Sequence, residues 1–488
     1  MMTEEERIFP VTLWYSTLGM GDGHDFATRG YLMSLMDIGF TGIRIPPSIS
    51  TAVLMLDEMA DPDIIKFASL TRPPAAARMK PLTLIKAGDP RIGTTKVIPG
   101  TDRFGEPLPM EVKITEGSID LDVPQEYVSA ATQEVRSVVI HHDPASLARH
   151  YTTLTKHGRP SRVGYVGVTV WETSHIPDAV AMMLNELNSV VVPSNHSRDA
   201  LMNSGVEIPV EVVRHTFDYR QWPCPTNEDL GLVLGADGAF SERDRRDKYV
   251  FYAIATPIER KNLKGLMRAY FKAFEGRDDV VLRIKTSSMK AELAPVANEA
   301  LDEAKITGRR PPFKVFGGKW PTEKIRAFHL DGDCYVSACR AEGFGLCEME
   351  AKLCGSRVIT SEWGAAREFL EYMEVNHLDP MSGSPYREPM GRGEVTTGSD
   401  VLIPCDLIPV TGMYGIGCYD EDQRWADPNE EALIEAMRRA ADQRLGPDRG
   451  SWSRLRVELG AERIGNELAA VIIGAREAAE LEGDEDVF

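Results

Sequence analysis

Residues 334–351 read CYVSACRAEGFGLCEMEA, a short apolar strand pattern followed by a turn that is bracketed by glycines. The apolar spacing after the turn predicts a helix that begins near Leu346. In a parallel sheet, a strand that leads through such a turn into a helix places the turn at the carboxyl edge of the sheet, where ligands bind. This stretch therefore predicts an α/β fold with a ligand site at the turn.

Strand-like runs that alternate with helical patterns extend from this stretch in both directions. They predict two doubly wound, Rossmann-like domains that face each other across a cleft. Proline, glycine and charge interrupt the pattern over 61–123, which is expected to be an irregular insertion. The expected division is a first domain over 1–218, a linker over 219–248, a second domain over 249–455, and a C-terminal helix with an acidic tail over 456–488.

The composition is that of a globular enzyme with a strong negative balance. The chain has 488 residues and a net charge of −19, which disfavours nucleic acid and anionic membranes, although a local basic groove stays open as an alternative. The N-terminus is acidic and no apolar run approaches the roughly 18 residues that span a bilayer, so we expect a cytoplasmic protein without a transmembrane segment. The seven cysteines lack zinc spacing, and we expect buried thiols and no metal site.

The glycine turn has the composition of an anion site. Backbone N–H groups at a helix N-terminus suit a diphosphate, and glycines let that backbone approach it closely. Glu342 precedes the turn and Glu350 lies one helical turn beyond it, so two carboxylates flank the anion and suit the vicinal hydroxyls of a sugar and a ribose. The alternative is an ordinary solvated glutamate pair. The expected amide donors are those of Gly343, Phe344, Gly345 and Leu346.

Two adjacent cations follow the first strand of the second domain, in the segment 255–263 that reads ATPIERKNL. A nucleoside diphosphate gains negative charge as its bond to a sugar breaks, and Arg260 and Lys261 supply positive charge for that step without a metal ion. The alternative is a solvated helix start. Their position at the end of a predicted strand favours the site.

Glu342, seven intervening residues and Glu350 resemble the E-x7-E motif of retaining GT-B glycosyltransferases, in the large family that includes sucrose and glycogen synthases. The segment 255–263 resembles that family's phosphate-binding segment. Three further segments resemble the family in the same order, and the similarity runs over about 163–440. The resemblance implies a GT-B fold, with Arg260 and especially Lys261 on the donor diphosphate. It also implies that Gly317 frames the base and that 376–418 is a second insertion. The three segments are 213–218, 315–318 and 364–368.

The first domain is expected to hold the acceptor. A loop with glycines at alternate positions predicts that Gly21 covers the sugar and phosphates. Many relatives have a histidine near the donor sugar after a strand of this domain, whereas this chain has Trp171 and Glu172 there. Glu172 and His175 are therefore candidates on the acceptor side, and so is the pair at 141–142, with a structural histidine as the alternative.

The resemblance implies a retaining, metal-independent glycosyltransferase. Its co-substrate would be a nucleoside-diphosphate sugar carrying a hexose, and no other cofactor is expected. A GT-B phosphorylase and a nucleotide-sugar epimerase are the alternatives within the fold, and an inactive sugar-binding scaffold is the alternative outside enzymes. The acceptor hydroxyl belongs to a glycan, a lipid or, less favoured by charge, a modified nucleic-acid base. The donor base, the acceptor and the oligomeric state are left open.

Overall fold

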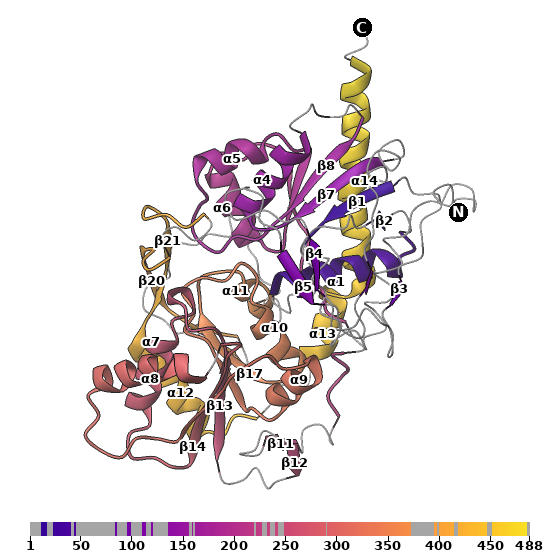
Figure 1. The fold of residues 1–488 in the computed structure, drawn as a ribbon. Helices are drawn as coiled ribbons and strands as arrows, with labels where there is room; N and C mark the ends of the chain where they lie inside the picture. Colours follow the sequence, from indigo (N-terminus) through magenta and orange to yellow (C-terminus); the bar gives the residue numbers. More distant parts are fainter. Residues whose placement is uncertain are drawn as a thin grey trace.

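The computed structural model contains two large sheets that are parallel throughout except at one edge strand, each with helices on both faces (Figure 1). The predicted pair of Rossmann-like α/β domains is therefore confirmed. The described residues are 11–16, 23–40, 43–44, 83–84, 95–98, 110–113, 119–120, 135–155, 159, 162–218, 221–226, 232–234, 240–242, 248–288, 290–371, 395–397, 400–413, 418–446 and 451–485.

The first domain has a six-stranded sheet in the order β10-β9-β8-β7-β1-β2, and all its neighbouring strands are parallel. Its strands carry runs of β-branched residues that are buried, as expected for a sheet covered on both faces. The strands are β1 (Val11–Tyr15), β2 (Ile43–Arg44), β7 (Val135–His141), β8 (Gly164–Val168), β9 (Ser189–Val192) and β10 (Val210–Val212).

Helices from both ends of the chain cover one face of this sheet. The long helix α14 (Ala461–Glu485) packs against α1 (Gly23–Asp37) and β8, although it follows the second domain in the sequence (Figure 1). A Cβ atom at Gly164 would lie 2.6 Å from the carbonyl oxygen of Ala475, so glycine is required where α14 crosses the sheet. The other face is covered by α4 (Pro144–Thr155), α5 (Asp178–Leu184) and α6 (Asn195–Asn203).

The second domain has a seven-stranded sheet in the order β15-β14-β13-β16-β17-β19-β18, in which only β18 runs antiparallel. The strands are β13 (Tyr249–Ile254), β14 (Val280–Lys285), β15 (Phe313–Phe316), β16 (Cys334–Val336), β17 (Arg357–Ser361), β18 (Val395–Thr397) and β19 (Asp400–Ile403). The helices are α7 (Leu263–Ala273), α8 (Lys290–Ala304) and α12 (Glu430–Asp442) on one face, and α9 (Thr322–Leu330), α10 (Leu346–Leu353), α11 (Ala366–Glu371) and α13 (Ser451–Glu458) on the other.

An antiparallel hairpin of the second domain contacts the first domain. Strands β20 (Cys405–Pro409) and β21 (Arg424–Pro428) pair with each other, and the hairpin contacts the segment that follows β8. The amide of Ser174 donates to the carbonyl of Arg424 at 3.0 Å, and the Ser174 hydroxyl accepts from the amide of Arg424 at 2.9 Å. The second domain therefore holds the first domain through backbone hydrogen bonds as well as through packing.

Segments that were predicted as a linker and as insertions contain regular elements. The predicted insertion 376–418 contains β18 and β19, so part of it belongs to the central sheet of the second domain. The predicted linker 219–248 contains a small hairpin made of β11 (Leu232–Leu234) and β12 (Phe240–Glu242). Within 61–123 the structure describes only four short strands in two antiparallel pairs, and the rest of that range lies outside the described residues. Those strands are β3 (Thr83–Leu84), β4 (Thr95–Ile98), β5 (Met110–Lys113) and β6 (Ile119–Asp120).

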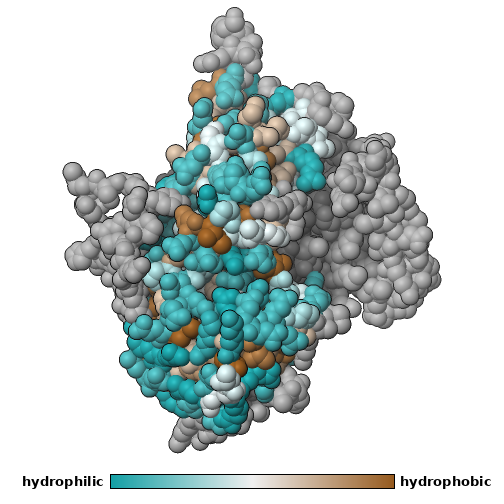
Figure 2. Space-filling model, turned by 90° about the vertical axis from the view of Figure 1, so that its left-hand side faces the viewer, coloured by the Kyte–Doolittle hydropathy of each residue, from teal (hydrophilic) through white to brown (hydrophobic). Residues whose placement is uncertain are grey.

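The described surface is predominantly hydrophilic on the face shown in Figure 2, with hydrophobic side chains scattered among polar ones. No helix in the described ranges combines the length and the apolarity that a bilayer crossing requires.

Candidate active site

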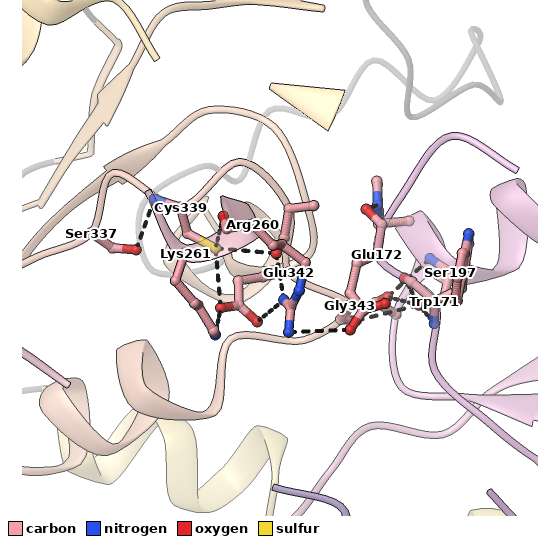
Figure 3. A network of polar contacts seen from close by, with 12 residues as sticks. Trp171, Glu172, Ser197, Arg260, Lys261, Ser337, Cys339, Glu342 and Gly343 are labelled. Atoms are coloured by element: carbon pink, nitrogen blue, oxygen red, sulfur yellow. Dashed lines mark hydrogen bonds and ion pairs between the residues drawn. The ribbon is translucent and has the colours of Figure 1, made fainter. Parts of the chain in front are cut away.

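The carboxyl ends of β13 and β16 bring together two cations and a carboxylate. Lys261 Nζ donates to Glu342 Oε1, and Arg260 Nη1 lies 3.4 Å from Glu342 Oε2 (Figure 3). Arg260 Nη1 also donates to the carbonyl of Ala341 at 2.7 Å. The sequence predicted these three side chains as one site, and the structure places them in direct contact.

A residue with a left-handed backbone conformation positions the two cations. Arg260 and Lys261 lie in a 3₁₀ turn, η6 (Glu259–Lys261), which ends at Asn262 with φ 46° and ψ 41°. Asparagine tolerates this region better than most residues. Its side chain accepts from the amide of Gly265 at 3.2 Å and donates to the carbonyl of Ala338 at 3.1 Å. Asn262 thereby caps α7 and ties the turn to the end of β16.

Burial and charge act in opposite directions on the two partners of the ion pair. Burial raises the pKa of Glu342, but Lys261 and Arg260 outweigh it and lower the pKa to about 2. Burial lowers the pKa of Lys261, and Glu342 outweighs it and raises that pKa. Both groups are therefore charged at neutral pH. Cys339 Sγ donates to Glu342 Oε1 at 3.3 Å, and burial raises the pKa of this thiol, so it stays protonated.

The glycine turn begins helix α10 at Leu346, as predicted. Gly345 has φ 92°, a region that favours glycine. A Cβ atom at Gly343 would lie 2.1 Å from Cγ2 of Val170 in the first domain. The Ser194 hydroxyl, at the N-cap of α6, donates to the carbonyl of Gly343 at 2.7 Å. The first domain therefore holds the turn in place.

The other predicted donor residues are placed by α10, by the end of β15 and by the glycine turn, except for one. Glu350 is on α10, and its Oε2 lies 3.4 Å from Nε2 of the buried His329. Gly317 directly follows β15, two strands away from β13 in the sheet order. Phe344 is buried and packs edge to face on His215 of the first domain, with ring centroids 4.9 Å apart. Gly21 lies outside the described residues.

Glu172 of the first domain joins the ion cluster. Its Oε1 lies 3.4 Å from Arg260 Nη2 (Figure 3), and its Oε2 accepts from the Tyr419 hydroxyl at 3.1 Å. Burial raises the pKa of Tyr419, so the phenol remains a donor. Arg260 is thus shared by a carboxylate from each domain. The sequence did not predict Tyr419, because it lies far along the chain beside the β20–β21 hairpin.

The other acceptor-side candidates lie apart from this cluster. His175 Nδ1 is 2.9 Å from the Ser174 hydroxyl, and its Nε2 is 3.6 Å from Asp422 near the hairpin. The ring of His141 lies 4.3 Å from that of His24, and burial lowers the pKa of His141. The ring of His142 also stacks on His24, at 5.3 Å. Among the described residues, no group of three or more histidine, cysteine or acidic side chains has metal-site geometry.

Neither a family profile nor a curated protein sequence matches the chain. Solved structures do resemble it. HepE of Anabaena in complex with UDP and glucose superimposes with a TM-score of 0.55 at 11% identity, over 96% of this chain and all of HepE. Sucrose-phosphate synthase of Thermosynechococcus elongatus superimposes with a TM-score of 0.51 at 13% identity, over 96% of this chain and all of that protein. These similarities show that the chain has the predicted GT-B fold.

Proposed function

We propose that the protein is a retaining glycosyltransferase that moves a hexose from a nucleoside-diphosphate sugar to an acceptor hydroxyl. The observation that carries the proposal is the pair of partly buried cations, Arg260 and Lys261, held against Glu342 beside a glycine turn at a helix N-terminus. The likeness to HepE, which was solved with UDP-glucose, supports the class of donor. It also makes UDP-glucose the first donor to test.

In this proposal the donor diphosphate binds between the two cations and the amides of 343–346. Glu342 binds hydroxyls of the sugar, and Glu350 binds the ribose. As the bond to the sugar loosens, Arg260 and Lys261 stabilise the negative charge that develops on the leaving diphosphate. The acceptor hydroxyl attacks from the same face, and its proton passes to a phosphate oxygen of the leaving group. This route uses no nucleophile from the enzyme and no metal ion.

The donor-free ion pairs define what must change when the donor binds. Arg260 contacts both Glu172 and Glu342. These two carboxylates therefore neutralise the positive charge with which a donor diphosphate would pair. A bound diphosphate competes with Glu172 for Arg260 Nη2, because both are anions that attract the same guanidinium group. Once released, Glu172 is a free carboxylate of the first domain next to the transferred sugar, suited to orient an acceptor hydroxyl.

A panel of sugar nucleotides tests the donor class. One class among UDP-, GDP-, ADP- and dTDP-sugars is expected to raise the melting temperature strongly, because a ligand at 100 times its dissociation constant adds about 2.7 kcal/mol of stability. Release of the nucleoside diphosphate only in the presence of an acceptor would then separate a transferase from an epimerase. Absence of stabilisation by every sugar nucleotide would contradict the proposal.

Lys261→Ala is expected to weaken donor binding by about 10- to 100-fold, since a charge-assisted hydrogen bond contributes about 1.5 to 3 kcal/mol. Binding is measured by calorimetry with the donor that the panel identifies. The matched control is Lys264→Ala, because Lys264 lies on the next turn of the chain but is 40% exposed and pairs with Glu303 on the surface. The control should bind like the wild type, and equal binding by both variants would remove Lys261 from the donor site.

A further inference from the structure

A third acidic side chain, Glu348, lies beneath the glycine turn and has no role in the reaction outlined above. It belongs to the first turn of α10, the helix whose N-terminus faces the proposed diphosphate. Its side chain is 1% exposed, and its Oε1 has no hydrogen-bond partner. The Oε2 atom lies 3.3 Å from the position that a Cβ atom of Gly345 would occupy. A buried carboxyl oxygen without a partner is costly unless a proton or a ligand satisfies it.

The groups that face Glu348 do not neutralise it. Glu342 repels a negative charge there and Lys261 attracts one, but Lys261 is already paired with Glu342. Hydrogen bonding from the Glu348 backbone and from Ser337 lowers the pKa of this carboxyl, but burial and Glu342 raise it by more. Three further titratable neighbours are neutral, because burial raises their pKa values; they are Tyr335, Cys339 and Cys347.

We propose that Glu348 is a further ligand of the donor diphosphate. The Glu348 side chain is the neutral acid in the complex, and its unpartnered oxygen donates a hydrogen bond to a phosphate oxygen. The inference rests on the proposed function. An ionised Glu348 would repel the diphosphate at the same helix N-terminus, whereas the acid adds a donor to those that the backbone amides supply. Donor binding is then linked to uptake of a proton by this residue.

The direction of the pH dependence follows from the charge. Burial, and after it the charge of Glu342, raises the pKa of Glu348 to about 7 in the free protein. A bound diphosphate raises it further because it is negative. Below pH 7 the acid is already present and binding needs no proton. Above pH 7 the proton must be taken up, so affinity falls as the pH rises.

The test compares wild type with Glu348→Gln, in which a neutral amide donor replaces the acid at similar size. UDP-glucose is the probe, because both of its phosphates are esterified and neither titrates near neutral pH. From about pH 6 to about pH 8.5 the wild-type dissociation constant is expected to rise by more than about fivefold, with a limit of tenfold per unit above the pKa. The variant should change by less than about twofold over the same range.

The matched control is Glu299→Gln on α8, which removes one negative charge from the same domain at a side chain that is 64% exposed. It should keep the pH dependence of the wild type. If Glu348→Gln keeps that dependence as well, or if wild-type binding does not change with pH, the proposal is overturned.

A second measurement needs no ligand and separates this inference from the proposed function. Folding raises the pKa of the Glu348 carboxyl from its ordinary value of 4.5 to about 7. The folded protein therefore loses stability as the pH rises through this interval. The melting temperature of Glu348→Gln should therefore exceed that of the wild type increasingly over this interval and by a constant amount above it. A difference that does not vary with pH would show that Glu348 does not hold the proton. Failure of every sugar nucleotide to bind, with this difference present, would contradict the transferase instead.

Discussion

Replacing Glu342 with glutamine is expected to reduce sugar transfer by about 10³-fold while the protein remains folded. The carboxylate is ionised, partly buried, and held by Lys261 and Arg260 directly beside the glycine turn. In the proposed reaction it binds sugar hydroxyls while the bond to the diphosphate breaks, and a neutral amide of the same size loses that charge. The measurement is turnover with the donor identified by the nucleotide panel, together with the melting temperature of the variant.

Donor affinity separates this effect from a loss of binding. Glutamine at this position leaves Arg260 and Lys261 in place, so the variant should still bind the sugar nucleotide. Glu259→Gln is the matched control, because Glu259 pairs with Arg340 in the same turn but is 45% exposed. That control should keep its turnover within about twofold, as expected for an exposed pair. Wild-type turnover by Glu342→Gln would exclude Glu342 from the reaction.

The predictable part of the site is the part that the backbone places locally. Glu342, Arg260 and Lys261 each follow a strand, and neighbouring parallel strands end at one edge, so strand ends far apart in the sequence meet there. This is why residues from 255–263 and 334–351 were expected at one edge, where the structure places the ion cluster. Glu348 was not singled out, because in sequence it is one more glutamate on a helix. Only its burial reveals that it differs from a solvated residue.

The elements that were missed depend on long-range packing. Strand β19 is a short apolar run within a stretch that otherwise lacks periodicity, and only its pairing with β17 identifies it as part of the sheet. Tyr419 reaches Glu172 because the β20–β21 hairpin folds over the first domain. Helix α14 shows a helical pattern in sequence, but nothing in that pattern indicates that it packs on the first domain.

Contacts between the domains and the geometry of the turn are physically coupled. Ser194 donates to the carbonyl of Gly343, and the amide of His196 in α6 donates to Glu368 of α11 at 2.8 Å. The amide of Ala365, just before α11, donates to the carbonyl of Glu342 at 2.9 Å. Movement of the first domain therefore acts on Gly343 directly and on Glu342 through α11. If the domains close when the donor binds, the closure completes the site in the presence of the donor and not before.

Replacing Lys352 with methionine is expected to lower the free energy of unfolding by about 3 to 5 kcal/mol, because it removes the cation that pairs with a buried carboxylate. Lys352 Nζ lies 2.9 Å from Asp400, and both side chains are almost wholly buried. Asp400 also accepts from the amide of Val358 at 2.9 Å, so the pair ties α10 to β17 and β19. Chemical denaturation measures the loss. The double variant Lys352→Met with Asp400→Asn should recover part of it, since no buried charge remains.

The matched control for this pair is Arg463→Ala on α14, which removes an exposed partner of Glu467. It should cost no more than about 0.5 kcal/mol, as for other exposed helix pairs. A cost below about 1 kcal/mol for Lys352→Met would mean that Asp400 is protonated or hydrated in the fold, because an ionised and dry carboxylate cannot lose its cation so cheaply. A large cost would show that the second domain depends on this ion pair, which anchors the helix that carries Glu348 and Glu350 to the sheet.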